Sequence, residues 1–234
     1  MLYGMDVSRY QELASDGTFL DSDVEAKYQE AEFVIAKATQ GISYVNSYNC
    51  DKVIQRAIKD GKKFGFYHYA GGNDPEDEAQ WFYDNCLGYI GEGIPCLDFE
   101  KTQNNAWSDS DWCLKFVNKF YELTAVWPVV YTSAAYISKI ASCSDYCGLW
   151  VAGYPDTSVC DWSDKPKFAY SISPWDVYTI WQFTNSAGVL DLDVANLTED
   201  SWDLIARGDM DELQETEATE DEADSGHCSC CCCN

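Results

Sequence analysis

Two carboxylates stand one residue apart at the end of a short apolar run, where they could perform acid–base chemistry. The apolar residues 94–97 are followed by Asp98, Phe99 and Glu100. Side chains at positions i and i+2 of a strand point to the same side, so we expect Asp98 and Glu100 to share one face. Carboxyl groups in unequal surroundings acquire different pKa values, so one can keep its proton while the other is ionised. This pattern is useful to a hydrolase.

Further polar and aromatic side chains stand at the ends of the other expected strands. Chemistry in a β/α barrel takes place at the carboxyl ends of the strands, so residues at these ends are the site candidates. In chain order they are Asp6, Lys37, Tyr67, Tyr69, Asp98, Glu100, Tyr131, Trp150, Gln182 and Asp191. Clustered carboxylates among aromatic rings, a lysine and an amide suit a neutral polyol with apolar ring faces. We therefore expect a carbohydrate to bind there.

The elements that must position these residues alternate between strands and helices. Strands are expected over residues 2–6, 33–37, 64–69, 94–97, 128–131, 148–152, 178–183 and 189–194. Helices are expected over 23–30, 46–60, from Pro75, from an N-cap at Ser108 or Asp109 to about 123, and over 134–140. Alternation predicts a parallel sheet, and this many units predict a closed barrel. Because helical intervals become rare later in the chain, we expect an irregular TIM-like (β/α)5(β)3 barrel, of α/β class, with a more antiparallel closing portion.

The composition divides the chain into a body and a tail. We expect a catalytic barrel over residues 1–207 and an acidic, Cys-rich tail over 208–234. Residues 209–225 are acidic and poor in apolar side chains, so disorder is predicted there. Five of the 12 cysteines lie in the last seven residues, and we interpret the scattered others as reduced core thiols. An open doubly wound sheet is the alternative for the body, but no expected strand precedes a glycine-rich phosphate loop.

Charge and hydropathy exclude several classes of partner. The formal net charge of −25 disfavours binding to nucleic acid or to anionic lipid. No apolar run reaches the length that spans a bilayer. The first residues enter a strand-like pattern without a basic region or a cleavage site, so we expect no secretory signal. The expected partners therefore include neither nucleic acid nor a membrane.

Two other kinds of site fit the residues less well. A Ser-His-Asp or Cys-His hydrolase would depend on His68, the single histidine before the tail, and no Gly-x-Ser-x-Gly segment is present. We interpret His68 as a core histidine. Cys143 and Cys147 lack a matching histidine or cysteine pair, and Lys37 disfavours a carboxylate metal site. We therefore expect no metal and no cofactor.

Six segments, taken in order, resemble the motifs of the Chalaropsis-type lysozymes, glycoside hydrolase family 25. They are Tyr3–Gln11, Ala36–Thr39, Gly65–Tyr69, Leu97–Glu100, Trp181–Thr184 and Leu190–Asp193. The resemblance implies a five-plus-three barrel and N-acetylmuramidase activity, with Glu100 as proton donor and Asp6, Asp98 and Asp191 as supporting acids. The last motif of the family usually reads Asp-x-Asn, whereas this chain has Asp193 in place of the Asn. We favour Asp191 as the acid that points inward.

The expected reaction is cleavage of the β-1,4 bond between N-acetylmuramic acid and N-acetylglucosamine in peptidoglycan glycan strands. Glu100, with a raised pKa, would protonate the glycosidic oxygen. Asp98 would stay ionised and act as a nucleophile or orient the substrate's N-acetyl group. A catalytically silent wall-binding barrel and a chitinase-like glycosidase are the alternatives. We expect the protein to be a monomer. We expect it to be either a phage endolysin, which reaches the cell wall after release from the host cytoplasm, or a processed form of a secreted protein.

Overall fold

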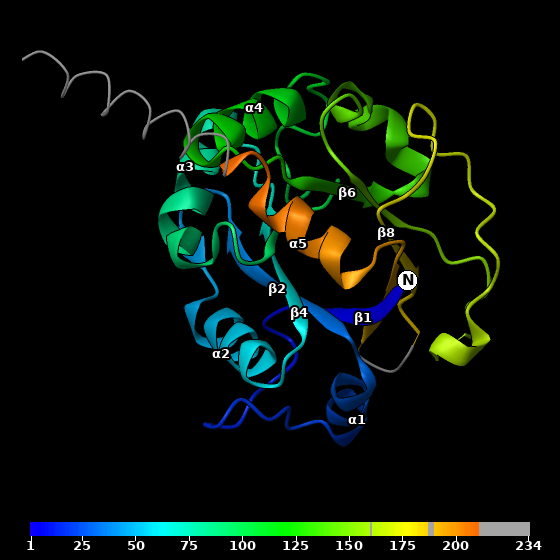
Figure 1. Cartoon of the computed structure of the whole chain (residues 1–234). Coiled ribbons are helices and arrows are strands. Elements are labelled where there is room, and N and C mark those ends of the chain that lie inside the picture. Colours follow the sequence, from blue (N-terminus) through cyan, green and yellow to red (C-terminus); the bar gives the residue numbers. More distant parts are fainter. Residues whose placement is uncertain (160, 187–189, 211–234) are drawn as a thin grey trace, which may run out of the picture.

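Eight strands close into a barrel in the computed structural model, which describes residues 1–159, 161–186 and 190–210 (Figure 1). The strands are β1 (Leu2–Val7), β2 (Phe33–Gln40), β4 (Lys63–Tyr69), β5 (Ile94–Asp98), β6 (Val129–Ser133), β7 (Leu149–Ala152), β8 (Ile180–Thr184) and β9 (Asp191–Ala195). Neighbours from β1 to β8 are parallel, whereas β9 runs antiparallel to both β8 and β1 and closes the ring. A short strand, β3 (Tyr44–Val45), pairs antiparallel with the end of β2.

Four helices on the outside and one at the end complete the barrel. The outer helices are α1 (Ser22–Glu30), α2 (Ser47–Lys59), α3 (Pro75–Cys86) and α4 (Trp112–Thr124), and α5 (Glu199–Arg207) follows β9. Between β6 and β7 the chain forms two short 3-10 turns, Ala134–Lys139 and Ala141–Cys143, in place of the helix expected over 134–140. The predicted irregular β/α barrel is confirmed, and its antiparallel closing portion is limited to β9.

The helix starts follow from local side-chain chemistry. Asp21 caps α1 and Asp74 caps α3, because each carboxylate accepts from two backbone N–H groups of the first turn. The predicted start of α4 at Ser108 or Asp109 is wrong, since the helix begins at Trp112. The Asp109 carboxylate instead accepts from the backbone N–H of Asp111, 2.9 Å away, in the turn before the helix. Sequence analysis did not predict α5.

α5 closes one end of the barrel, and Figure 1 shows it lying across the strands. Trp202 is fully buried, its indole N–H donates to the backbone oxygen of Phe64 at 3.1 Å, and its ring lies 4.8 Å from that of Phe33. Phe33 and Phe64 stand at the beginnings of β2 and β4. α5 therefore covers the amino-terminal end of the parallel strands and leaves the carboxyl-terminal end for a site.

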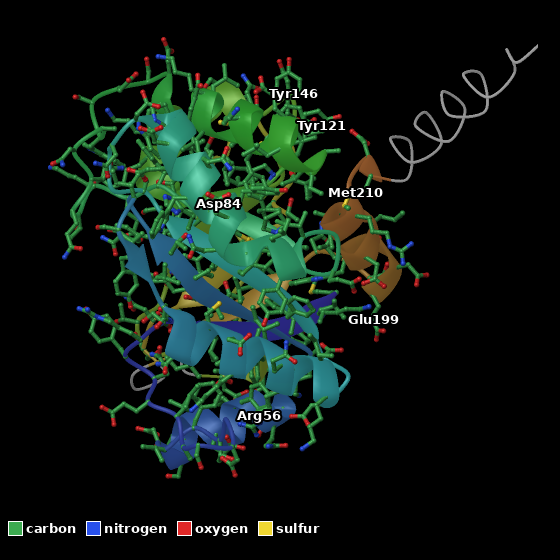
Figure 2. All side chains as sticks on the ribbon, turned by 90° about the vertical axis from the view of Figure 1, so that its left-hand side faces the viewer. Arg56, Asp84, Tyr121, Tyr146, Glu199 and Met210 are labelled. Atoms are coloured by element: carbon green, nitrogen blue, oxygen red, sulfur yellow. The ribbon has the colours of Figure 1, made fainter. Side chains whose placement is uncertain are left out.

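The cysteines of the described residues are free thiols in the core. Cys50, Cys86, Cys96, Cys113, Cys143 and Cys147 are all free and buried, as predicted, whereas Cys160 and residues 211–234 of the tail lie outside the described residues. Packing continues past α5, because the Tyr121 hydroxyl donates to Asp209 at 2.8 Å. Figure 2 shows Tyr121 and Met210 on the same side of the molecule. Of the helices described, none combines the length and apolar composition needed to cross a bilayer.

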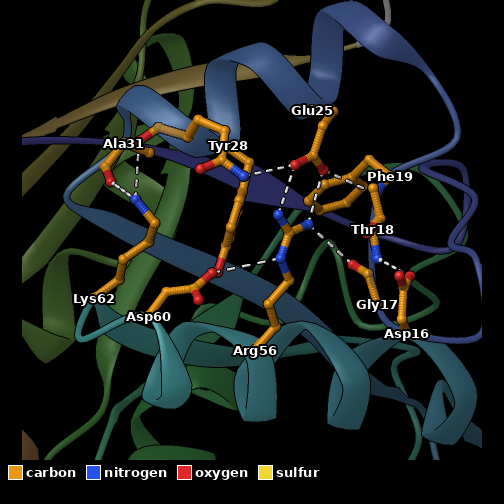
Figure 3. A network of polar contacts seen from close by, with 11 residues as sticks. Asp16, Gly17, Thr18, Phe19, Glu25, Tyr28, Ala31, Arg56, Asp60 and Lys62 are labelled. Atoms are coloured by element: carbon orange, nitrogen blue, oxygen red, sulfur yellow. Dashed lines mark hydrogen bonds and ion pairs between the residues drawn. The ribbon is translucent and has the colours of Figure 1, made fainter.

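Arg56 ties α2 to α1 and to the loop that precedes α1 (Figure 3). Its guanidinium donates to both carboxylate oxygens of Glu25, at 2.6 and 2.8 Å, and to the backbone oxygen of Gly17 at 3.1 Å. The same group lies 4.0 Å from the ring centroid of Tyr28. Planar, two-point pairing of this kind is both strong and directional. It fixes the loop that begins at Ser8.

Replacing Arg56 with Met should lower the free energy of unfolding by about 1.5–3 kcal/mol, the range for a hydrogen bond to a charged group. Hydrogen bonding from Arg56 lowers the pKa of Glu25 from 4.5 to about 2. The stabilisation is therefore complete above pH 4.5 and is lost as the pH falls towards 2. Urea denaturation at about pH 6 and about pH 3 checks this. Lys59→Met, on the same helix, is the control, and an Arg56 effect that is equal at both pH values would contradict the assignment.

Candidate active site

The orientation of Asp98 and Glu100 is fixed by the residue between them. Phe99 is fully buried and stacks at 5.4 Å on Trp107 and at 5.6 Å on Trp112, in the layer between strands and helices. Because alternate side chains in an extended segment point to opposite sides, this packing directs Asp98 and Glu100 the other way, towards the barrel axis. The two acids therefore share one face.

Strand register brings the predicted acids together from distant parts of the chain. Asp6 on β1 stands opposite Asp191 on β9. Asp98 on β5 lies between Tyr69 on β4 and Tyr131 on β6. The charge on Asp98 is close enough to interact with Glu100, Asp6 and Asp191. All four acids thus converge at the carboxyl-terminal end of the barrel, where catalytic groups of such barrels sit.

Gln182 connects Asp6 to two tyrosines. Its amide N–H donates to the Asp6 carboxylate at 2.6 Å, and its amide oxygen accepts from the Tyr131 hydroxyl at 3.0 Å. The Tyr154 hydroxyl donates to the same amide oxygen. Gln182 is only 3% exposed, so its amide has one orientation in which both ends are satisfied. This network holds one Asp6 oxygen in place.

Trp150 lies beneath the acids. It is 2% exposed, and its indole N–H donates to Asp193 at 2.8 Å. Its ring packs at 4.7 Å on Tyr131 and at 6.1 Å on Tyr67. Trp150 does not line the cavity beside Asp98, so the contact between Trp150 and a substrate stays a prediction. The sequence favoured Asp191 as the inward-pointing acid, and Asp193 is also part of the buried site.

A cavity of about 520 Å³ opens beside Asp98. Its size is within the usual range for small-molecule sites. It is lined by Ser8, Arg9, Tyr10, Lys37, Gln40, Gly41, Ser43, Tyr44, Tyr67, Tyr69, Gly71, Asp98, Thr102 and Gln103. The predicted binding residues Lys37, Tyr67 and Tyr69 thus face it. Tyr131 and Gln182 do not line it, and they lie next to the acids on the neighbouring strands.

Lys37 places a positive charge among these groups. Its ammonium donates to Gln40 at 2.8 Å and lies 4.2 Å from the ring centroid of Tyr69. Burial lowers the pKa of Lys37, and the charges of Asp98 and Glu100 oppose that shift. In return, the lysine lowers the pKa of both acids. Lys37 is therefore the electrostatic partner of the carboxylate pair.

Burial is the main reason why the acids hold protons. It raises the pKa of Glu100, and it raises that of Asp6 well above the usual range, with the charge of Asp193 as the next cause. Burial, then the charges of Asp6 and Glu100, raise the pKa of Asp191 to about 8. Removal of a carboxylate from water without a compensating donor favours its neutral form. The expected raised pKa of Glu100 is confirmed.

The expectation that Asp98 stays ionised requires correction. Burial, followed by the charge of Glu100, raises the pKa of Asp98 well above its usual range, although Lys37 opposes the shift. The Asp98 Oδ1 atom is enclosed and finds no hydrogen-bond donor in the described parts of the chain. An anion at this position is thus incompletely compensated. Burial thus raises the pKa of both Asp98 and Glu100.

His68 has the structural role that we predicted. Its two ring nitrogens lie 2.8 Å from the Thr39 hydroxyl and 2.8 Å from the Glu78 carboxylate, and both His68 and Glu78 are fully buried. Glu78 also accepts from the backbone N–H groups of Gly71 and Asn73. This network anchors the loop after β4, which forms one wall of the cavity. Sequence reasoning did not identify Glu78.

The structure also adds residues that the pattern of strand ends could not reveal. Arg9 and Tyr10 belong to the loop after β1, and Tyr44 and Gln103 belong to other segments around the cavity. Arg9 and Tyr10 fall within the segment Tyr3–Gln11 that carried the resemblance, so that segment was the available signal. Within residues 1–159, 161–186 and 190–210, His, Cys, Asp and Glu side chains form no group of three or more suited to a metal ion.

Comparisons with known proteins agree with this geometry. The sequence profile of the glycosyl hydrolases family 25 matches residues 5–192. An N,O-diacetylmuramidase from Chalaropsis sp is 27% identical over 193 residues, which cover 76% of this chain and 86% of that protein. A muramidase from Acremonium alcalophilum has a TM-score of 0.68 at 21% identity, over 89% of this chain and all of that one. The CTP1L endolysin has a TM-score of 0.62 at 23% identity, over 88% of this chain and 69% of that one.

Replacing Lys37 with Met should raise the pKa of Asp98 and Glu100 further, because the nearby positive charge that favours their ionised forms is lost. The carboxyl titrations should move to higher pH by about one unit or more. Carbon-13 NMR of labelled Asp and Glu side chains measures this shift. Lys115→Met, an exposed residue on α4, should leave both titrations unchanged. Titrations that do not move in the Lys37 variant would show that the lysine charge does not act on the pair.

Proposed function

Because the chain belongs to the glycosyl hydrolases family 25, we propose that it is a muramidase. It hydrolyses the β-1,4 bond between N-acetylmuramic acid and N-acetylglucosamine in the glycan strands of bacterial peptidoglycan. The observation that carries this proposal is the convergence of Asp6, Asp98, Glu100 and Asp191 at the open end of the barrel, beside a cavity. The Chalaropsis relative, which is an N,O-diacetylmuramidase, supports the same substrate class.

Glu100 is the general acid in this mechanism. Burial raises its pKa and so favours the protonated form that a general acid needs, although Tyr131, Lys37 and Tyr69 oppose the shift. It gives this proton to the glycosidic oxygen as the bond from that oxygen to the anomeric carbon breaks. The carboxylate left behind then accepts a proton from the water that completes hydrolysis. One carboxyl group thus serves as acid and then as base.

Asp98 orients the acetamido group of the N-acetylmuramic acid residue. The acetamido oxygen attacks the anomeric carbon and forms a cyclic intermediate, and Asp98 accepts a hydrogen bond from the acetamido N–H. The Asp98 carboxyl group has no donor for its enclosed Oδ1 atom among the described residues, and it faces the cavity with its other side. A hydrogen bond from the acetamido N–H on the cavity side therefore favours the ionised form of Asp98 while positive charge develops at the anomeric carbon. Lys37 favours the same ionised form. Direct attack by Asp98 on the anomeric carbon is the alternative retaining route.

Arg9 gives a reason to favour peptidoglycan over chitin. N-acetylmuramic acid carries a lactyl carboxylate, or the peptide attached to it, whereas the sugar of chitin carries no charge there. Arg9 is an exposed cation on the cavity wall of a protein whose net charge is −25, and its guanidinium lies 5.1 Å from the ring centroid of Tyr10. A guanidinium pairs readily with a carboxylate. We assign Arg9 to recognition of this acidic group.

The remaining parts of the proposal concern setting and assembly. We place the protein in a phage lysis system, as an endolysin that meets the wall after release from the host cytoplasm. The likeness of its fold to the CTP1L endolysin is consistent with that setting. We propose that it acts as a monomer. We also propose that it has no nucleic-acid or membrane partner, because its net charge of −25 disfavours binding to phosphates and to anionic lipid.

Replacing Glu100 with Gln should abolish hydrolysis, with a loss of at least about a hundredfold, because the amide keeps the shape but cannot donate an acidic proton. Clearing of a suspension of purified walls measures the rate. Mass spectrometry should show reducing N-acetylmuramic acid ends from the wild type only. The control is Glu92→Gln, an exposed acid on the same segment. Undiminished clearing by the Glu100 variant would refute the acid assignment, and cleavage of chitin in preference to walls would refute the substrate.

Replacing Arg9 with Gln should raise KM for wall fragments about fivefold, because an exposed charge-assisted contact with the substrate is lost. The turnover number should change little, since Arg9 lies away from the bond that is cleaved. Steady-state kinetics on soluble glycan fragments separates the two parameters. Arg207→Gln, an exposed residue at the other end of the barrel, is the control. An unchanged KM would remove Arg9 from substrate recognition.

A further inference from the structure

Asp193 is a completely buried carboxyl group for which the proposed mechanism has no role. It stands on β9, opposite Gly4 of β1 and opposite Gln182 of β8, two residues further along the strand than Asp191. Its Oδ1 atom accepts from the Trp150 indole at 2.8 Å. Its Oδ2 atom is enclosed, and the described residues offer it no donor. A buried acceptor without a donor is costly, so this atom requires an explanation.

The side chain that meets Asp193 is another carboxyl group. Asp6 and Asp193 are in side-chain hydrogen-bond contact. Each also accepts from one fixed neutral donor, Gln182 for Asp6 at 2.6 Å and Trp150 for Asp193 at 2.8 Å. Ionised carboxylates only accept hydrogen bonds, so two of them cannot bond to each other. A hydrogen bond between Asp6 and Asp193 therefore requires a proton on one of them.

We propose that Asp193 is a positioning residue for Asp6, and that the two carboxyl groups share one proton across their contact. The shared proton, with Gln182 on the other side, fixes the orientation of Asp6. It also keeps the pair at a single negative charge while Glu100 and Asp98 act. This inference rests on the proposed function for its role in the reaction, whereas the shared proton itself follows from the geometry.

Groups on every neighbouring strand face this pair. They include the carboxyls Asp98, Glu100 and Asp191, the tyrosines Tyr67, Tyr131 and Tyr154, and the thiol Cys96. None of these side chains carries a positive charge at neutral pH. The positive charge of Lys37 interacts with Asp98 and Glu100. A second negative charge on the pair would therefore meet only repulsion and a dry environment. Retention of the proton removes that repulsion.

A comparison with Asn at position 193 shows what the proton contributes. An Asn amide N–H could donate to an ionised Asp6, so that the single negative charge would reside on Asp6. With Asp193 the same total charge is divided between two carboxyl groups and includes a titratable proton. The substitution of Asn for Asp193 therefore exchanges a shared proton for a fixed donor.

Asp193→Asn tests the inference directly. Carbon-13 NMR of labelled aspartate should show that, in the wild type, Asp6 and Asp193 titrate as one coupled pair and lose the last proton well above the ordinary aspartate range. The Trp150 indole N–H resonance should move in the same titration, because it donates to Asp193. In Asp193→Asn this titration should vanish from the Trp150 signal, and Asp6 should titrate as a single group at lower pH. Asp145→Asn, an exposed substitution, should change neither signal.

Enzyme kinetics supply the functional readout. The pH profile of kcat/KM should shift in Asp193→Asn together with the Asp6 titration seen by NMR, with KM unchanged because Asp193 does not line the cavity. Asp193→Leu, which can neither share a proton nor donate, should lower kcat at least tenfold, and Asn should restore most of that loss. Separate titration of Asp6 and Asp193 in the wild type at ordinary aspartate values would overturn the shared proton, whether or not the variants fold. If the coupled titration is seen but no wall cleavage occurs, the pair stands and the muramidase proposal fails.

Discussion

The repulsion among carboxyl groups packed into one dry space is the constraint on which the site depends. Burial pushes the acids towards their neutral forms, and each additional charge pushes its neighbours further in the same direction. This repulsion is opposed by the half-buried Lys37, by hydrogen-bond donors such as the amide of Gln182, and by raised carboxyl pKa values. General acid catalysis needs a carboxyl group that is protonated at the working pH. For Glu100 the cause of the raised pKa is burial itself, so the dry space that costs stability also prepares this acid for its task.

The outer layer of the barrel determines which side chains meet in that space. Phe99 between Asp98 and Glu100, and Leu192 between Asp191 and Asp193, are both completely buried among apolar neighbours on the helix side. Each of these residues forces the polar residues beside it to the inner side, because the strand alternates. A slip of one residue in β9 would exchange the two sets and bury the wrong side chains. Packing outside the barrel thus specifies the chemistry inside it.

Much of this arrangement could be predicted from the sequence. Alternating strands and helices predicted the barrel, and the principle that catalytic groups sit at strand ends was enough to bring together Asp6, Asp98, Glu100 and Asp191. Helix α5 was missed, because its part in the fold comes from the contact of Trp202 with residues far away in the chain. The depth of Trp150 and the contact of Asp193 with Asp6 depend on register between strands, which a single sequence does not reveal. The protonation of Asp98 likewise depends on burial.

Trp202, whose indole closes the amino-terminal end of the barrel, also limits how a polymeric substrate can reach the site. With Trp202 filling that end, no passage runs through the barrel, and a long chain of sugars cannot be threaded along its axis. A glycan must therefore approach the acids from the carboxyl-terminal rim, and both products must leave by that same side. The plugged end thus gives the barrel one working face and leaves the opposite face to stability alone.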